Sequence, residues 1–226
     1  MASIIKVPDN GEKISFDAND QLIIPNQPII PYITGDGIGE DIMLPMQEVV
    51  SSAIKKAYGS KKEIIWMEVF AGAKANKLYG NGIWLPKETI EALESYVISI
   101  KGPLATPVGG GIRSLNVALR QQLDLFVCLR PIKYFEGVPS PLKFPSNTNM
   151  VIFRENTEDI YAGIEYQAKS TESKKIMALL AQFNDKSKIR FPETSALGIK
   201  PVSIKGSERL IRKAIEFAMK NNSNSV

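Results

Sequence analysis

Short apolar runs alternate with amphipathic stretches along the first half of the chain, and this alternation is the feature that most constrains the fold. The run at 28–33 predicts a buried strand, and an amphipathic helix over about 42–58 follows it. Further strands are predicted near 64–69 and 97–100, with a helix that Pro86 opens between them. Because a parallel strand reaches its neighbour through a helical crossover, this pattern favours an α/β fold with a parallel sheet.

The other predicted elements extend over the rest of the chain. Alternating apolar positions within residues 1–25 indicate an N-terminal hairpin. Residues 164–203 are typical of a separate small unit, with a first strand, a helix over 171–181, and short strands near 189–191 and 199–203. The remaining predictions are a helix over 114–122, strands over 125–129 and 150–153, and a final helix over 207–220.

The sequence contains no histidine and a single cysteine, and these counts exclude whole classes of chemistry. Without histidine there is no Ser-His-Asp or Cys-His nucleophile and no histidine-containing metal site. Cys128 alone forms no internal disulfide and no cysteine-based zinc site, and a single thiol is consistent with a reducing compartment. Any acid–base catalysis must therefore use carboxylates, lysine or tyrosine.

An excess of positive charge raises the question of a nucleic-acid partner. The formal net charge is +4, and residues 168–226 hold 12 Lys and Arg against 5 Asp and Glu. Because aromatic stacking positions are not interleaved with these cations, a solvated or partner-facing surface is favoured over nucleic-acid binding. No run approaches the roughly 20 apolar residues of a membrane span. The N-terminus is unlike a secretory signal, so we expect a cytoplasmic protein without a membrane partner.

A glycine-rich turn joins the first long predicted strand to the helix after it. Residues 35–39 read Gly-Asp-Gly-Ile-Gly, which is similar to a dinucleotide-binding fingerprint. The G-x-G-x-x-G spacing requires a glycine at position 40, where this sequence has Glu40. The adjacent carboxylates of Glu40 and Asp41 would also repel a pyrophosphate. A structural tight turn is therefore favoured over direct phosphate binding.

Two arginines directly follow apolar runs. Arg130 follows 125–129 and Arg154 follows 150–153, so each is predicted at the C-terminal end of a strand. Ligands of open α/β sheets bind beyond these ends. A guanidinium in such apolar surroundings must be paired or face a cleft, because burying an unpaired charge is costly.

The predicted helix over 114–122 presents polar groups that suit the same kind of ligand. Asn116 and Arg120 are four residues apart and share a face, and Ser114 lies at the helix start, where backbone N–H groups favour an anion. Together with Arg130 and Arg154 they form a candidate clamp for a polycarboxylate, because guanidinium groups bind carboxylates in bidentate fashion. Structural ion pairs are the alternative, and they are the favoured explanation for any one arginine alone.

Tyr161 is the candidate proton donor. It lies in the segment 154–163, which reads Arg-Glu-Asn-Thr-Glu-Asp-Ile-Tyr-Ala-Gly. Nearby positive charge lowers the pKa of a phenol and suits it to proton transfer. The alternative is an ordinary tyrosine at the edge of a core, and spacing alone favours that alternative.

Residues 101–120, 129–131 and 154–163 together closely resemble the bacterial NADP-dependent isocitrate dehydrogenases, within the isocitrate/isopropylmalate dehydrogenase family. The pattern Ser114-x-Asn116-x-x-x-Arg120 distinguishes them from the isopropylmalate dehydrogenases. The resemblance implies the α/β fold of that family, with two α/β domains and a small clasp segment. It also implies oxidative decarboxylation of isocitrate to 2-oxoglutarate, with NADP and with Mg²⁺ or Mn²⁺.

The resemblance further implies roles for individual residues. The carboxylates of isocitrate would be bound by Ser114, Asn116, Arg120, Arg130 and Arg154. Tyr161 would protonate the enol that decarboxylation leaves. Lys101 and Thr106 would approach the nicotinamide, and Ala105 stands where the family has a threonine that contacts the cofactor. Ser114 also resembles the serine that a regulatory kinase, opposed by a phosphatase, modifies in some members.

Members of this family are roughly twice as long, so the resemblance implies an N-terminal half. A large domain would take residues 1–125, a small domain 126–158 and 204–226, and a clasp 159–203 that joins two copies as a homodimer. The metal-binding aspartates and a catalytic lysine would lie in the half that is missing. The alternative belongs to another class of function: a non-catalytic fragment that binds tricarboxylates or dimerises.

Overall fold

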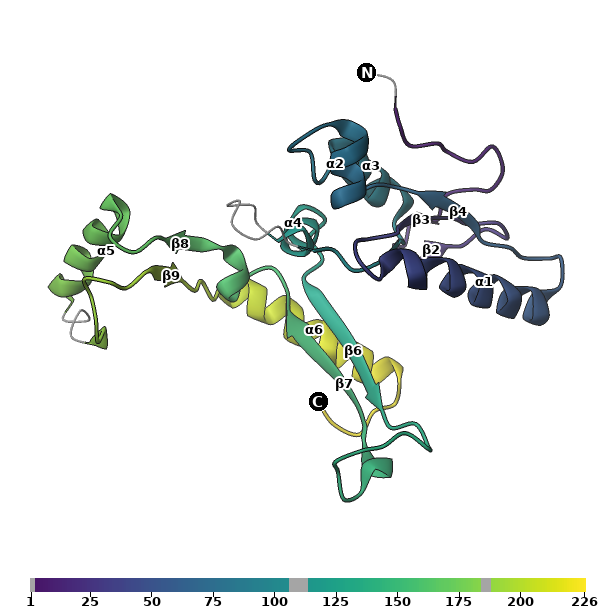
Figure 1. Ribbon diagram of the computed structural model, residues 1–226. Helices are drawn as coiled ribbons and strands as arrows, with labels where there is room; N and C mark the ends of the chain where they lie inside the picture. Colours follow the sequence, from purple (N-terminus) through teal and green to yellow (C-terminus); the bar gives the residue numbers. More distant parts are fainter. Residues whose placement is uncertain (1–2, 106–113, 184–187) are drawn as a thin grey trace. The chain divides into compact units, whose positions relative to one another are not determined.

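The computed structural model describes residues 3–105, 114–183 and 188–226, and the chain divides into two compact units, Met1–Leu123 and Asp124–Val226 (Figure 1). Within the described part of the chain, no helix is long and apolar enough to cross a membrane.

A three-stranded parallel sheet forms the centre of the first unit. β3 (Ile29–Ile33) lies between β4 (Ile65–Glu68) and β5 (Ile100–Lys101), in the order β4-β3-β5. The chain passes from β3 to β4 through α1 (Gly39–Tyr58), which begins three residues before the predicted start. The parallel α/β arrangement predicted for this part of the sequence is confirmed.

Three further helices follow in the first unit. α2 (Ala73–Tyr79) and α3 (Lys87–Tyr96) connect β4 to β5, and α4 (Leu115–Gln122) comes after β5. The strand predicted over 97–100 is wrong in its bounds. Val97 closes α3 with a φ of +67°, so its backbone is not extended and pairing with β3 begins only at Ile100.

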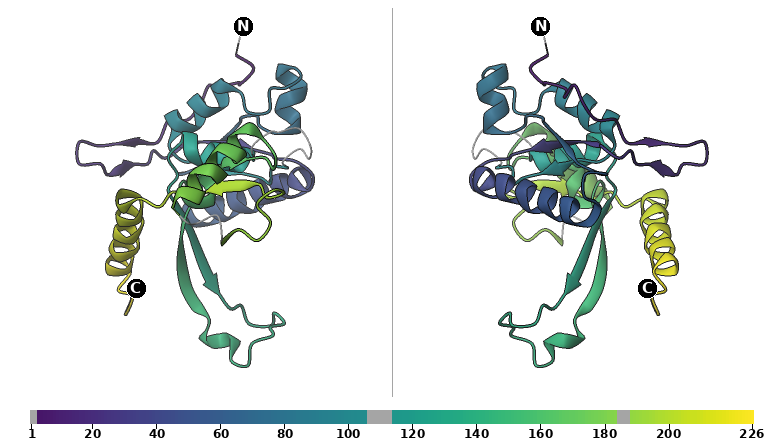
Figure 2. Two further views of the ribbon diagram at one scale, coloured as in Figure 1. Left: turned by 90° about the vertical axis from the view of Figure 1, so that its left-hand side faces the viewer. Right: turned by 90° about the vertical axis from the view of Figure 1, so that its right-hand side faces the viewer.

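The N-terminal hairpin predicted from alternating apolar positions is confirmed. β1 (Ser15–Phe16) and β2 (Leu22–Ile23) pair antiparallel, with Ser15 opposite Ile23. Figure 2 shows this short hairpin projecting from the first unit.

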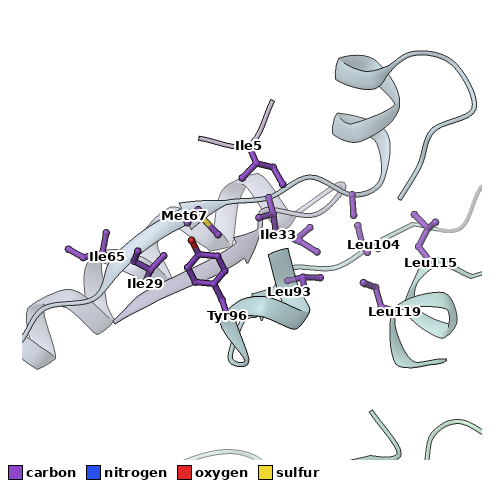
Figure 3. Close-up of a cluster of buried hydrophobic side chains, with 12 residues drawn as sticks. Ile5, Ile29, Ile33, Ile65, Met67, Leu93, Tyr96, Leu104, Leu115 and Leu119 are labelled. Atoms are coloured by element: carbon purple, nitrogen blue, oxygen red, sulfur yellow. The ribbon is translucent and has the colours of Figure 1, made fainter. Parts of the chain in front are cut away.

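Buried apolar side chains from the sheet, α3 and α4 form the core of the first unit (Figure 3). The sheet contributes Ile33 and Met67, each 1% exposed, and α4 contributes Leu115 and Leu119, each 4% exposed. Burying each such side chain stabilises the fold by about 1.5–3 kcal/mol. Because the two leucines fix the rotation of α4, the residues at 116 and 120 lie together on another part of the helix surface.

An antiparallel ribbon is the main feature of the second unit. β6 (Val127–Lys133) pairs with β7 (Asn149–Glu155), and a short 3₁₀ helix, Pro145–Asn147, lies in the connection. α6 (Ile204–Lys220) packs on β7, where the rings of Phe153 and Phe217 meet edge to face at 5.4 Å. The predicted strands are therefore present and longer than expected, but they are not parallel.

A second, smaller pair of strands completes this unit. After the 3₁₀ helix Asp159–Ala162, β8 (Ile164–Tyr166) pairs antiparallel with β9 (Leu197–Ile199), and α5 (Thr171–Gln182) lies between them in the chain. The strand predicted near 199–203 therefore lies earlier in the sequence. Nothing in the structure tests the division of this unit into a small-domain part and a clasp, which stays a prediction.

The strand predicted over 189–191 is wrong. The backbone carbonyl of Phe191 accepts hydrogen bonds from Thr194 N at 3.2 Å and from the Ser195 hydroxyl at 2.7 Å. These bonds close a turn at Pro192, which has no N–H to donate to a sheet. α6 likewise starts earlier than predicted, because the Ser203 hydroxyl caps it by accepting from Gly206 N at 2.9 Å.

Candidate functional site

Asp36 joins three segments that lie at the C-terminal edge of the parallel sheet. Its backbone N–H donates to the carbonyl of Pro103 at 2.6 Å. Its carboxylate accepts from Ala73 N at 2.8 Å and from Ala105 N at 2.9 Å. The glycine-rich turn after β3, the start of α2 and the segment after β5 are thus held together at the edge where ligands of such sheets bind.

Lys101, one of the predicted cofactor-binding residues, ends β5 at this same edge. Its ammonium donates to the carbonyl of Gly102 at 2.6 Å. Although the residue as a whole is exposed, burial around the ammonium lowers the pKa of Lys101, the charge of Arg120 lowers it further, and Asp36 acts in the opposite direction. Lys101, Arg120 and Asp36 therefore share one electrostatic environment.

The other two predicted cofactor positions are Ala105 and Thr106, and neither provides a described side-chain hydroxyl for a cofactor. Ala105 is exposed, and its backbone N–H is already bonded to Asp36, so it offers a cofactor neither a hydroxyl nor that N–H. Thr106 lies outside the described residues.

The predicted substrate residues of α4 are in contact with one another and with the segment after β5. The Arg120 Nε donates to the backbone carbonyl of Asn116 at 3.1 Å, as expected for residues four apart in a helix. The Asn116 side-chain amide donates to the carbonyl of Leu104 at 3.3 Å. Ser114 stands at the N-cap position of α4, half-buried, with no capping hydrogen bond from its side chain among the described residues.

Arg130 and Arg154 lie on one face of the β6–β7 ribbon, for a reason that differs from the prediction. Arg130 is in the middle of β6 and pairs with Ile152, whereas Arg154 pairs with Cys128. Because the strands are antiparallel, their C-terminal ends are at opposite ends of the ribbon, and the expectation that both arginines follow strand ends is wrong. Paired residues and those two positions away share a face, so Arg130 and Arg154 occupy diagonal positions on that face.

Neither of these guanidinium groups is neutralised by a carboxylate within the described residues. Arg130 is exposed and its Nε donates to the Cys128 Sγ at 3.2 Å. The guanidinium of Arg154 lies 4.9 Å from the centre of the Tyr161 ring. No salt bridge joins Arg130 or Arg154 to Asp or Glu in this part of the chain. Two cations side by side without a counter-charge are suited to binding an anion.

The turn between Arg154 and Tyr161 is built by its own side chains. Burial by itself raises the pKa of Glu155, but hydrogen bonds from Glu158 N, Thr157 N and the Thr157 hydroxyl outweigh it and lower the pKa overall. Asn156, 5% exposed, donates its side-chain amide to the carbonyl of Leu125 at 2.7 Å. These bonds fix the chain that leads to Tyr161.

The remaining acidic residues of this segment are also bonded. Glu158 accepts from the hydroxyl of Ser203 at 2.6 Å and from its backbone N–H at 2.9 Å, which lowers the pKa of Glu158. Asp159 pairs with Lys200 at 3.0 Å, which lowers the pKa of Asp159. Across the described ranges no three His, Cys, Asp or Glu side chains form a group that could hold a metal ion.

The sequence analysis missed three residues that shape these regions: Asp36, Asn156 and Arg209. Arg209 on α6 bonds both carboxylate oxygens of Asp124 at 2.9 Å and the Thr157 hydroxyl at 2.8 Å. An acidic residue within a glycine-rich turn at the end of a strand was a usable signal for Asp36. No local pattern marks Arg209, because its partners lie 52 and 85 residues away.

Comparisons with known proteins all point to one protein family. The family model described as isocitrate/isopropylmalate dehydrogenase matches residues 29–226. The chain is similar to the protein named isocitrate dehydrogenase [NADP] of Pseudomonas aeruginosa, with 56% identity over 98% of the chain and 53% of that protein. The protein of the same name from Coxiella burnetii is 59% identical over 98% of the chain and 52% of its own length. The chain spans about half the length of the curated relatives it matches.

Solved structures of similar proteins point to the same family fold. The crystal structure of isocitrate dehydrogenase from Methylococcus capsulatus has a TM-score of 0.63 and 36% identity, over 86% of this chain and 48% of that one. A protein structure from Thermus thermophilus has a TM-score of 0.60 and 29% identity, over 95% of this chain and 36% of that one.

Proposed function

Because the chain belongs to the isocitrate/isopropylmalate dehydrogenase family, we propose that it takes part in the oxidative decarboxylation of isocitrate to 2-oxoglutarate with reduction of NADP. The α/β fold expected from the resemblance agrees with the family model and with the solved structures. Curated relatives at 56–59% identity carry the name isocitrate dehydrogenase [NADP], which supports this activity and this cofactor over others.

The observation that carries the proposal is the pair of cations on the β6–β7 ribbon. Arg130 and Arg154 share a face and lack a carboxylate partner among the described residues. Guanidinium groups bind carboxylates through two parallel hydrogen bonds each, so the pair suits a ligand with several carboxylates. Isocitrate is such a ligand.

The face of α4 is proposed to bind the same substrate class. Arg120 and Asn116 supply a cation and an amide, and Ser114 supplies a hydroxyl at the N-terminus of the helix, where an anion is favoured. Ser114 is also the proposed target of a regulatory kinase and phosphatase. A phosphate there would add roughly two negative charges and repel the substrate anion.

Tyr161 is proposed to donate the proton that the enol takes up after loss of carbon dioxide. A guanidinium over its ring holds the phenol beside the proposed carboxylate site, because cation and ring attract one another. Tyrosine, carboxylates and lysine are the acids and bases that this histidine-free sequence offers.

The described residues do not by themselves form a site for Mg²⁺ or Mn²⁺, because no three carboxylates converge among them. They also do not complete an NADP site, since Ala105 has no hydroxyl and its N–H is bonded to Asp36. We therefore derive no step through either group. Homodimer formation through residues 159–203 and a cytoplasmic location are part of the same proposal.

The rival function is a non-catalytic module that binds tricarboxylates or dimerises; the chain spans about half the length of these relatives. Two measurements on the 226-residue chain separate the possibilities. Calorimetric titration with isocitrate tests binding, and NADPH absorbance with isocitrate, NADP and Mg²⁺ tests turnover. We expect binding without turnover above about 1 s⁻¹, the low end of ordinary enzyme rates. The same assay on a longer protein that contains this chain should show turnover, and its absence there would refute the proposed activity.

A further inference from the structure

Asp36 connects three backbone segments at the C-terminal edge of the parallel sheet, and the proposed function gives its carboxylate no part in the reaction. Both carboxylate oxygens accept backbone N–H groups, one from the start of α2 and one from Ala105. Its own N–H donates to Pro103. One residue therefore bonds the segment 102–105 at two points, the carbonyl of Pro103 and the N–H of Ala105.

The glycines near Asp36 are required by this close approach. Gly35 has a φ of +89°, and a Cβ there would collide with the carbonyl of Pro103. At Gly72, where φ is +76°, a Cβ would lie 2.5 Å from the Asp36 carboxylate. The glycine pattern that superficially resembles a phosphate-binding loop thus lets two backbones and one carboxylate come into contact.

Two further side chains also bond the segment around 102–105. The Asn116 amide donates to the carbonyl of Leu104, whose side chain is 8% exposed. Lys101, immediately before the segment, donates to Gly102. Asp36 and Asn116 therefore set where the backbone after β5 runs, between one proposed cofactor residue and one proposed substrate helix.

We infer that Asp36 is a positioning residue, which holds the segment 102–105 and thereby places Lys101 and, through the bond from Asn116 to Leu104, the helix α4 for reaction with a tricarboxylate and a nicotinamide cofactor. This inference rests on the proposed function for its catalytic consequence, but not for its structural part. Small displacements of such groups are costly, since a shift of about 1 Å can slow a reaction roughly 100-fold.

The matched variants are Asp36→Asn and Asp41→Asn. Asparagine keeps the size of Asp36 but has one oxygen, so it can accept only one of the two N–H groups and turns a donor toward the other. Asp41 is exposed on the first turn of α1 and has no side-chain hydrogen bond within the described residues. Its substitution removes the same charge from a nearby position of the chain without breaking either bond to Asp36.

The first measurement is amide hydrogen exchange, which needs no activity. In the wild-type protein the N–H of Ala105 should be protected although the residue is exposed. In Asp36→Asn, exchange of the peptides covering 72–75 and 102–105 should be about tenfold faster, with the β6–β7 ribbon unchanged. Rapid exchange of Ala105 N–H in the wild-type protein would overturn the inference even if Asp36→Asn did not fold.

The second measurement is steady-state kinetics in an active enzyme that carries these residues. Asp36→Asn should lower kcat roughly 10- to 100-fold while the KM for isocitrate stays within about threefold, because Arg130 and Arg154 are unaltered. Removing the Asp36 charge also lowers the pKa of Lys101 further, so the alkaline limb of the rate profile should move to lower pH. Asp41→Asn should change neither quantity.

The two measurements together distinguish a positioning role of Asp36 from a purely structural role and from failure of the proposed function. Faster exchange together with a lower kcat and a shifted alkaline limb supports the positioning role. Faster exchange with kinetics equal to those of Asp41→Asn would mean that Asp36 only stabilises the turn, and the inference would be wrong. If the wild-type enzyme does not oxidise isocitrate at all, the proposed function fails, while the exchange data still decide whether Asp36 holds the segment.

Discussion

Arg154 is a diagonal neighbour of Arg130 across the β6–β7 ladder, because Arg154 pairs with Cys128 and Arg130 pairs with Ile152. Two like charges at such a spacing repel one another, and the described residues provide no carboxylate to offset them. The arrangement is unfavourable for the protein alone and favourable in the presence of an anion. Within the described residues, this pair is the arrangement that most directly favours the binding of an anion.

Removing either guanidinium should weaken isocitrate binding. In an active enzyme that carries these residues, Arg130→Ala and Arg154→Ala should each reduce kcat/KM by the equivalent of about 2–5 kcal/mol, and Arg120→Ala on α4 should do the same. Lys133→Ala is the control, because Lys133 lies on the other face of β6. Wild-type kcat/KM in two of the three arginine variants would contradict the carboxylate-binding role.

A negative charge at position 114 should lower the affinity for isocitrate far more than loss of the Ser114 hydroxyl. Ser114→Ala should leave the stability of α4 almost unchanged, because the hydroxyl makes no capping bond among the described residues, and should cost at most about 0.5–1.5 kcal/mol in binding. Ser114→Asp should abolish measurable affinity, because a carboxylate would face the substrate anion. Isothermal titration with isocitrate compares the two, and normal affinity in Ser114→Asp would place Ser114 outside the site.

Replacing Tyr161 by phenylalanine should separate binding from proton transfer. The ring that contacts Arg154 is retained, so the affinity for isocitrate should be unchanged, while turnover should fall by about 10²–10⁴. Oxalosuccinate supplied directly tests the step after hydride transfer, and Tyr166→Phe on β8 serves as the control. Unaltered processing of oxalosuccinate by Tyr161→Phe would exclude the acid role.

Acid should destabilise the second unit through Glu155 and Glu158. The pKa of each is lowered in the folded state. Burial raises the pKa of Glu155, but hydrogen bonds outweigh that effect. For Glu158, hydrogen bonds from Ser203 lower the pKa. A lowered pKa gives stability that is present above the ordinary glutamate value of about 4.3 and is lost as the pH falls through the folded value. Urea unfolding between about pH 6 and pH 3 should show this slope.

Substitution of the two carboxylates provides the check on that slope. The double variant Glu155→Gln, Glu158→Gln should flatten the dependence of unfolding free energy on pH below about pH 5. Glu165→Gln on β8 is the control, since Glu165 is exposed and makes no side-chain hydrogen bond in the described part of the chain. Equal slopes in the double variant and the wild-type protein would show that these carboxylates do not drive acid unfolding.

Arg209 should be important for the stability of the second unit. Its guanidinium bonds Asp124 and the Thr157 hydroxyl and lies 4.4 Å from the Phe126 ring. Since the ion pair is partly exposed, Arg209→Ala should reduce the free energy of unfolding by about 1–3 kcal/mol. Arg212→Ala, on an exposed position of the same helix, should cost less than about 0.5 kcal/mol. Equal urea midpoints for the two variants would contradict this role.

Some of the fold and the candidate site followed directly from the sequence. Periodicity and i,i+4 spacing, which are local, predicted the described α-helices other than α2, most strands, the N-terminal hairpin and the shared face of Asn116 and Arg120. The motif around Ser114 indicated the family before any comparison, and the family model agrees. The strand wrongly predicted at 189–191 shows the limit of such patterns. The spacing of apolar residues there did not predict the turn that the hydrogen bond from Ser195 to Phe191 closes.

What only the tertiary structure decided is how distant segments meet. The sequence placed Arg130 and Arg154 at strand ends, but their proximity comes from the antiparallel register of β6 and β7. The sequence likewise identified the turn at 35–39, but not that Asp36 bonds Ala105, 69 residues away. The physical reason is the same in both cases. Hydrogen-bond register and the approach of one backbone to another depend on the packing of whole elements, and no repeat or spacing within a single segment encodes them.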